Sequence, residues 1–131
     1  MRKLGAKLFV LVLAMTLSFG MTASANPFIV SYGNSYSNSL SAGQGHAYIL
    51  PNAKTTGTSV RITTSVANTL QLRYYWSYNN TTIDLGTAIV NSTNYSSGSG
   101  YYSPGTLITV IERVPGSTTA YPSVSYTITF N

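Results

Sequence analysis

Residues 58–78 read TSVRITTSVANTLQLRYYWSY, and this stretch decides the fold. Apolar and polar side chains alternate along residues 58–66, a period of two that is typical of a β-strand with one buried face. The alternation returns in residues 69–78, where leucine and aromatic residues occupy every second position. Ala67 and Asn68 predict a turn between the two, because asparagine tolerates the backbone conformations of tight turns. The stretch therefore predicts two half-buried strands.

The segments on either side predict further strands. Residues 107–114 are apolar on both faces until Glu112 and Arg113, which is typical of a central strand. Residues 83–90 predict a shorter edge strand, weakened by Asp84 and carrying a bulge at Gly86. The remaining strands are expected at residues 28–32, 46–50 and 124–130, and the last of them turns Val124, Tyr126, Ile128 and Phe130 inward.

The chain is therefore predicted to be all-β, a single antiparallel two-sheet β-sandwich of about seven strands and of the immunoglobulin-like type. A small closed barrel is the alternative. Residues 33–45 and 91–100 are rich in serine, asparagine and glycine and are predicted to be polar loops. No fixed repeat or long linker divides residues 26–131, which suffice for one core.

Three short motifs occur in the order found in bacterial pre-peptidase C-terminal domains. They are Leu70-x-Leu72, Gly100-Tyr101-Tyr102 and Tyr126-x-Ile128-x-Phe130. The chain resembles this family of secreted sandwich domains, which are typically appendages of hydrolases. It departs from the family where an acidic residue often stands beside the first motif and where Pro104 and Gly105 follow the tyrosines. The resemblance implies the fold and no activity.

Residues 1–25 have the features of a cleaved secretory leader. Basic residues precede an apolar run from Leu8 to Leu17, and Ala23-Ser24-Ala25 supplies the small side chains of a cleavage site before Asn26. The apolar run is short for a membrane span. We expect a signal peptide at residues 1–25, a mature domain at residues 26–131, and a secreted, extracellular protein with no membrane span after cleavage.

Charge and cysteine content exclude several classes of function. The mature chain would keep four of the seven basic side chains and both acidic ones, a net charge of 4 − 2 = +2. This surplus is too small to indicate a nucleic-acid partner. The sequence contains no cysteine, which excludes disulfides, redox control and thiolate metal sites. An exported domain without disulfides favours a bacterial source.

The titratable side chains are too few to suggest catalysis. The mature chain has one imidazole, His46, and two carboxylates, Asp84 and Glu112. It has no Gly-x-Ser-x-Gly motif and no metal-ligand spacing, and Glu112 is expected to form a cross-strand ion pair. We therefore expect no enzyme activity, no catalytic residue, no bound metal and no cofactor. A calcium ion held by Asp84 and loop carbonyls is the alternative.

Tyrosine is the residue type that stands out, with eleven copies beside one tryptophan. Tyr74, Trp76, Tyr78 and Tyr126 fall on faces assigned to the core. The other tyrosines include members on a polar strand face and in loops of small polar residues, a composition typical of recognition surfaces. Such rings also stack on sugars. The predicted ligand-binding residues are Tyr36, Arg73, Tyr75, Tyr95, Tyr101 and Tyr102.

These features predict a secreted, non-catalytic binding module that recognises extracellular glycan or cell-wall material through exposed tyrosines. Two alternatives stay open. Low charge and unprotected strand edges also suit self-association into an extracellular matrix or coat. A secreted inhibitor or toxin would instead bind a secreted or surface protein through residues 91–100.

Overall fold

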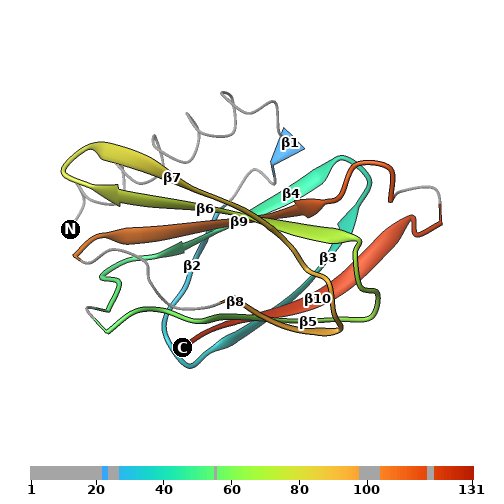
Figure 1. The fold of residues 1–131 in the computed structure, drawn as a ribbon, viewed down its shortest axis with the longest axis horizontal. Helices are drawn as coiled ribbons and strands as arrows, with labels where there is room; N and C mark the ends of the chain where they lie inside the picture. Colours follow the sequence, from blue (N-terminus) through green and yellow to red (C-terminus); the bar gives the residue numbers. More distant parts are fainter. Residues whose placement is uncertain (1–21, 24–26, 55, 98–103, 118–119) are drawn as a thin grey trace.

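The computed structural model describes residues 22–131 except 24–26, 55, 98–103 and 118–119. Ten strands form within these residues (Figure 1): β1 (Thr22–Ala23), β2 (Phe28–Ile29), β3 (Ser35–Ser41), β4 (Gln44–Leu50), β5 (Val60–Thr64), β6 (Leu70–Tyr78), β7 (Thr81–Ile89), β8 (Asn94–Ser97), β9 (Thr106–Arg113) and β10 (Ser123–Phe130). Among the described residues, no helix is long and apolar enough to cross a membrane.

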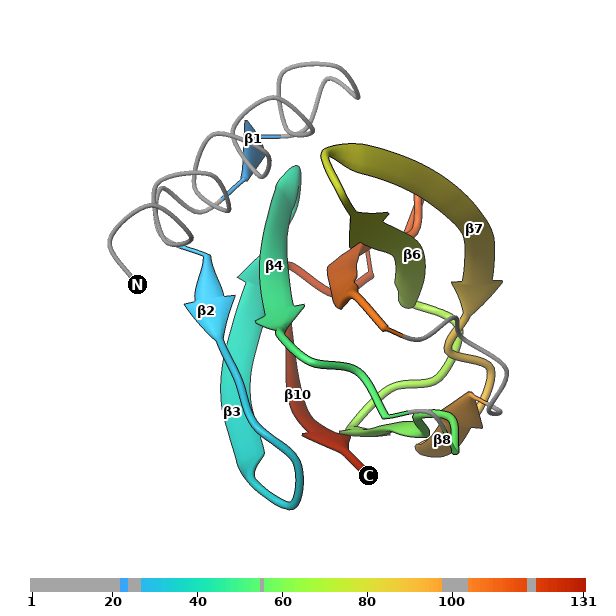
Figure 2. The same cartoon turned by 90° about the vertical axis from the view of Figure 1, so that its left-hand side faces the viewer.

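The strands build two sheets that pack face to face (Figure 2). Sheet A has the order β1-β4-β9-β6-β7, with β2 also paired to β4, and sheet B has the order β3-β10-β5-β8. Pairing is antiparallel except where β1 and β2 join β4. The all-β, two-sheet sandwich predicted from the sequence is therefore confirmed, and β9 takes its predicted central place.

Three strands were not expected from the sequence: β1, β3 and β8. The segments predicted as the polar loops 33–45 and 91–100 form β3 and β8, the two edge strands of sheet B. The prediction of loops there is wrong because their backbones pair with β10 and β5, whatever the polarity of their side chains. On β3 the hydroxyls continue this pairing, since Ser35 bonds Thr129 and Ser37 bonds Thr127, each at 2.8 Å.

Turn residues place the chain reversals close to where the sequence predicted them. Asn68 has a φ of 64°, but its turn leads from β5 in sheet B to β6 in sheet A, so the chain crosses between the sheets. Asn79 and Asn80, with φ of 49° and 61°, close the β6–β7 hairpin, as the left-handed pair of a tight hairpin turn requires. The predicted bulge near Gly86 is confirmed, since the register shifts there, and β7 is an edge strand.

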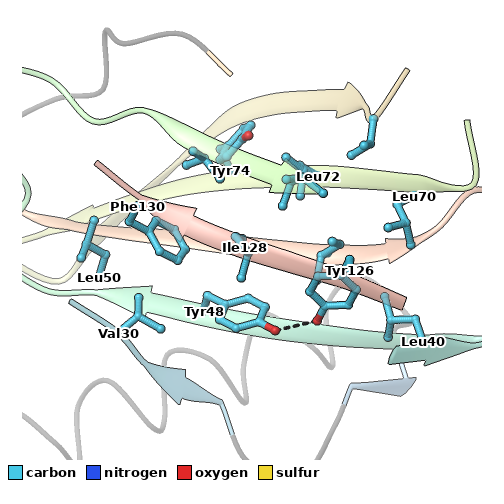
Figure 3. Close-up of a cluster of buried hydrophobic side chains, with 14 of the residues drawn as sticks. Val30, Leu40, Tyr48, Leu50, Leu70, Leu72, Tyr74, Tyr126, Ile128 and Phe130 are labelled. Atoms are coloured by element: carbon cyan, nitrogen blue, oxygen red, sulfur yellow. Dashed lines mark hydrogen bonds between the residues drawn. The ribbon is translucent and has the colours of Figure 1, made fainter. Parts of the chain in front are cut away.

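The core lies between the sheets and is built from the inward rows of both (Figure 3). The alternation of β10 is confirmed, because all four of its predicted inward side chains are at most 3% exposed. The buried cluster consists of Val30, Leu40, Tyr48, Leu50, Val60, Ile62, Leu70, Leu72, Tyr74, Val90, Leu107, Ile111, Val124, Tyr126, Ile128 and Phe130. Its apolar burial is the main stabilising term in a domain without disulfides.

A polar chain runs through this core. The hydroxyl of Tyr126 lies 2.7 Å from Nδ1 of His46 and 2.6 Å from the hydroxyl of Tyr48 (Figure 3 draws the second bond). Burial lowers the pKa of His46 and raises the pKa of both tyrosines. The three side chains therefore stay neutral near pH 7 and join β10 of sheet B to β4 of sheet A.

Arg113 forms the second polar tie between the sheets. Its side chain is buried, with the residue only 6% exposed, and it donates to carbonyl oxygens of Leu40 at 3.2 Å, Ser117 at 3.1 Å and Tyr121 at 2.5 Å. A buried guanidinium needs such acceptors, because an unsatisfied charge in the interior is costly. These bonds join Arg113 to Leu40 of β3 and to Ser117 and Tyr121, which follow β9.

Candidate functional site

The structure separates the predicted ligand-binding residues. Tyr101 and Tyr102 lie outside the described residues. Tyr36 and Tyr95 lie on the edge strands β3 and β8, and both pack against the core cluster. The register places them at the two ends of one inward row, Tyr36, Ile128, Ile62 and Tyr95. Placing them in loops was therefore wrong, since their rings close the edges of the core.

Tyr75 and Arg73 lie on the outer face of sheet A, but Tyr75 is not exposed there. It is 2% exposed and packs with the apolar side chains of β4 and β9, so the prediction of a polar face at Tyr75 is wrong. The sequence of β6 alone could not show this, because the neighbours of Tyr75 come from other strands. Burial is the main cause of the raised pKa of Tyr75.

Arg73 is already paired. Its Nε donates to Oε1 of Glu112 at 2.5 Å across the β6–β9 pairing, and the same oxygen accepts from Gln71 at 2.5 Å. The hydrogen bond to Glu112 raises the pKa of Arg73. The cross-strand ion pair predicted for Glu112 is confirmed, with Arg73 as its partner. Arg73 is therefore held in an ion pair.

The described residues do bring one half-buried and one exposed aromatic side chain together at one end of the sandwich. Trp76 and Tyr78 lie at the end of β6, and Ile83 pairs with Trp76 across the hairpin. The ring centroids of Trp76 and Tyr78 are 5.7 Å apart with 30° between the planes. Tyr78 is 43% exposed and Ile83 40%. We call Trp76, Tyr78 and Ile83 the hairpin platform.

The backbone of Gly105 lies against the platform. A Cβ at this position would overlap the Trp76 indole and would lie 2.9 Å from the carbonyl oxygen of Ser77, so only glycine fits. The carbonyl oxygen of Gly105 accepts from the backbone N–H of Ala53 at 2.8 Å. Residues 104–105 therefore pack against the Trp76 indole of the platform. The backbone hydrogen bond from Ala53 joins them to the loop that follows β4.

Lys54 follows Ala53 in the loop that is bonded to Gly105, and it contacts Tyr32. The backbone N–H of Lys54 donates to the hydroxyl of Tyr32 at 2.8 Å, and the Lys54 ammonium lies 4.0 Å from the centre of the Tyr32 ring. The Tyr32 hydroxyl also lies 2.6 Å from Oγ1 of Thr58. Asn79 and Asn80 are exposed at the hairpin tip. Apolar ring faces, amides and one ammonium therefore occur at the same end of the molecule.

The few groups with acid–base chemistry are dispersed. His46 is bonded inside the core, Glu112 is bonded to Arg73, and Asp84 accepts from the backbone N–H of Gly86 at 2.7 Å. The described part of the chain holds no group of three residues suited to a metal ion. Within the described ranges, these three side chains do not converge on one site.

Trp76 and Tyr78 continue the inward alternation of β6, so the sequence pattern predicts them in the core and does not predict the platform. Leu70, Leu72 and Tyr74 on the same face are buried, but exposure rises toward the hairpin end of the strand. One available signal was the Asn79-Asn80 turn, since an aromatic residue directly before a tight turn lies at the end of its sheet. On this face of β6, the position of a side chain along the strand decides how exposed it is.

No protein-family model and no curated protein matches the sequence. The fold is similar to the pre-peptidase C-terminal domain of collagenase from Bacillus anthracis, with a TM-score of 0.57, 9% identity, and 81% of this chain and 95% of that chain covered. The Yersinia pseudotuberculosis-derived mitogen is similar with a TM-score of 0.51 and 15% identity over 72% of this chain and 80% of its own. The fold-level resemblance drawn from the motifs is therefore confirmed.

Proposed function

We propose that this protein is a secreted, non-catalytic module that binds extracellular glycan through the hairpin platform. The observation that carries the proposal is the pair of neighbouring rings, Trp76 and Tyr78, at the exposed end of β6. Rings of this kind present a flat apolar surface to the C–H face of a sugar. The site of the proposal differs from the residues predicted from the sequence, while the ligand class is the same.

Polar groups around the platform suit the hydroxyls of a sugar. The exposed Asn79 and Asn80 each offer an amide with donors and an acceptor, and the tip continues into the exposed Thr81. The nearby Lys54 lies over the Tyr32 ring and adds one cation. Few charges and several neutral donors and acceptors favour a neutral polysaccharide over a polyanion.

The platform is also held in place before any ligand arrives. Gly105 contacts the indole, the hairpin turn is tight, and the 53–105 backbone bond joins the supporting loops. A binding surface that is already ordered loses less entropy when the ligand binds. Tyr101 and Tyr102 lie outside the described residues and remain ligand-binding residues proposed from the sequence alone.

Sedimentation of the secreted protein with purified cell wall, chitin and cellulose tests the proposal. We expect saturable binding to at least one polysaccharide and a loss of affinity of about tenfold in Tyr78→Ala, corresponding to about 1.4 kcal/mol. Tyr121→Ala is the matched control, because Tyr121 is 42% exposed and lies near Arg113, at the other end of β9. Thermal unfolding of both variants checks that the fold is intact.

Three outcomes would contradict this function. Equal loss of binding in the two tyrosine variants would remove the platform from the site. Pelleting without any polysaccharide would favour the alternative of self-assembly into a matrix or coat. A protein that stays in solution in every sample would favour a secreted or surface protein as the partner.

A further inference from the structure

Five apolar side chains lie on the face of sheet A that points away from sheet B. They are Ala47, Ile49, Tyr75, Ile108 and Val110, here called the outer cluster. The register joins them in two adjacent rows, because Ala47 pairs with Val110 and Ile49 pairs with Ile108, which pairs in turn with Tyr75. In the full chain none of the five is more than 4% exposed. The described residues therefore contain a second buried apolar cluster besides the core between the sheets.

The described strands form two layers only, and sheet B packs on the opposite face of sheet A. An antiparallel sheet with one face in water normally places polar residues on that face. The central strands of sheet A do not, since β4 is buried without interruption from Gly45 to Leu50 and β9 from Leu107 to Ile111. The outer face has the composition of a surface that is meant to be covered.

The predicted cleavage before Asn26 alters the edge of this face. It would remove β1, whose Ala23 pairs with Gly45 of β4, one row from Ala47 and Val110. The described residues after Asn26 contain no third layer over the outer cluster. We propose that the mature protein presents this face to a second copy of itself and forms a dimer in which the two sheets A pack against each other.

The charges of the face favour a second copy over a charged partner. Glu112 is already bonded to Arg73 and Gln71 at the border of the outer cluster, so neither charge of this pair requires a partner of opposite sign. The other charge on this face is Asp84, which pairs with Tyr75 at the β7 edge and accepts from the backbone N–H of Gly86. The centre of the face, at Ile108 and Val110, carries no charge. Two twisted sheets of this shape pack face to face at about 30°, as the sheets of a sandwich do.

The area of the face sets the expected strength of the dimer. Four strands about 4.8 Å apart and four side-chain rows about 6.7 Å apart give about 19 by 27 Å, a footprint of about 500 Å². A standard interface buries about 800 Å² on each partner. The dimer should therefore dissociate on dilution, with a Kd of about 1 μM to 1 mM.

Sedimentation equilibrium of the protein recovered after export, with its N-terminus sequenced, tests the inference. Residues 26–131 keep every strand but β1 and the whole core cluster, so the mature chain retains its fold. We expect a concentration-dependent dimer, and at least a tenfold weaker one in Val110→Lys with an unchanged melting temperature. Thr127→Lys, in the middle of the outer face of sheet B, is the matched control and should dimerise normally.

The inference is wrong if the mature protein stays monomeric at millimolar concentration, if its N-terminus retains residues 1–25, or if Val110→Lys dimerises as well as the parent. Should Val110→Lys fail to fold, Ala47→Glu at the neighbouring position on β4 repeats the test with the opposite charge. A loss of dimer in both Val110→Lys and Thr127→Lys would also overturn it. None of these readouts involves a glycan, so failure here leaves the proposed platform untouched.

Discussion

Replacing Tyr126 with phenylalanine should destabilise the domain more than any other loss of one hydroxyl from its core. The Tyr126 hydroxyl bonds both His46 and Tyr48, at 2.7 and 2.6 Å, so its removal breaks two buried hydrogen bonds at once. At about 1 kcal/mol net for each bond, the free energy of unfolding should fall by about 2 kcal/mol. Tyr48→Phe removes only the second of these bonds and should cost about half as much.

Urea denaturation of the parent and the two phenylalanine variants, followed by circular dichroism, measures these differences. For a domain of about 100 residues, 2 kcal/mol corresponds to a fall in melting temperature of about 8 to 16 °C. The double variant should then lose less than the sum of the single losses, because both variants break the same Tyr48–Tyr126 bond. Equal losses in Tyr126→Phe and Tyr48→Phe would show that the bond to His46 contributes nothing, and the reasoning would fail.

Three further predictions concern pH, the ion pair and the platform. Burial lowers the pKa of His46 from its ordinary value of 6.5, so the unfolded chain binds the proton more readily than the folded one. Stability should therefore be constant above about pH 6.5 and should fall as the pH drops from there toward the lowered pKa; a urea midpoint that does not fall between pH 7.5 and pH 5 would contradict this. Glu112→Gln removes the charge that faces Arg73 and should cost about 1 kcal/mol, since the pair is only partly buried; a smaller cost at high salt in matched denaturation curves would confirm an electrostatic origin. Gly105→Ala should push the indole of Trp76 aside, change the fluorescence of this single tryptophan and cost about 1 to 3 kcal/mol, whereas an unchanged emission spectrum would show that the contact is loose.

The strands that could be predicted are those whose buried face is visible as a pattern of apolar residues in the sequence. Residues 58–66 and 124–130 alternate strictly, and β5 and β10 occur there with the expected residues inward. Residues 107–114 are apolar on both faces, and β9 is the central strand of sheet A. Local periodicity was sufficient in these cases because burial repeats with the pleat of the strand.

The edge strands β3 and β8 could not be predicted in this way. Their segments are mostly serine and asparagine, and their regular structure comes from backbone pairing with β10 and β5. Tyr36 and Tyr95 were therefore placed in loops, although their rings close the core at its two edges. A strand of mostly polar residues cannot be predicted from periodicity when its regular structure comes from backbone hydrogen bonds to a distant part of the chain.

The candidate site depends even more on contacts between distant segments. Tyr75 shares its strand face with the polar residues Arg73 and Ser77, two positions away on either side. It nevertheless lies among Ile49 and Ile108, which come from two other strands. Trp76 and Tyr78 share a face with core leucines, yet the end of β6 leaves Tyr78 exposed. The exposure of an aromatic side chain is set by what packs over it, and the period of the strand carries no information about that.

The sequence by itself determined the class of this protein: an all-β sandwich without cysteine, rich in tyrosine, with one histidine and two carboxylate side chains widely spaced along the chain. These properties follow from composition and from periodicity along single strands, which are local quantities. Only the tertiary structure decided which aromatic side chains stay at the surface and that sheet A has apolar side chains on both faces. Both are set by strand register and by which layers meet, because burial is a property of neighbours brought together from distant parts of the chain.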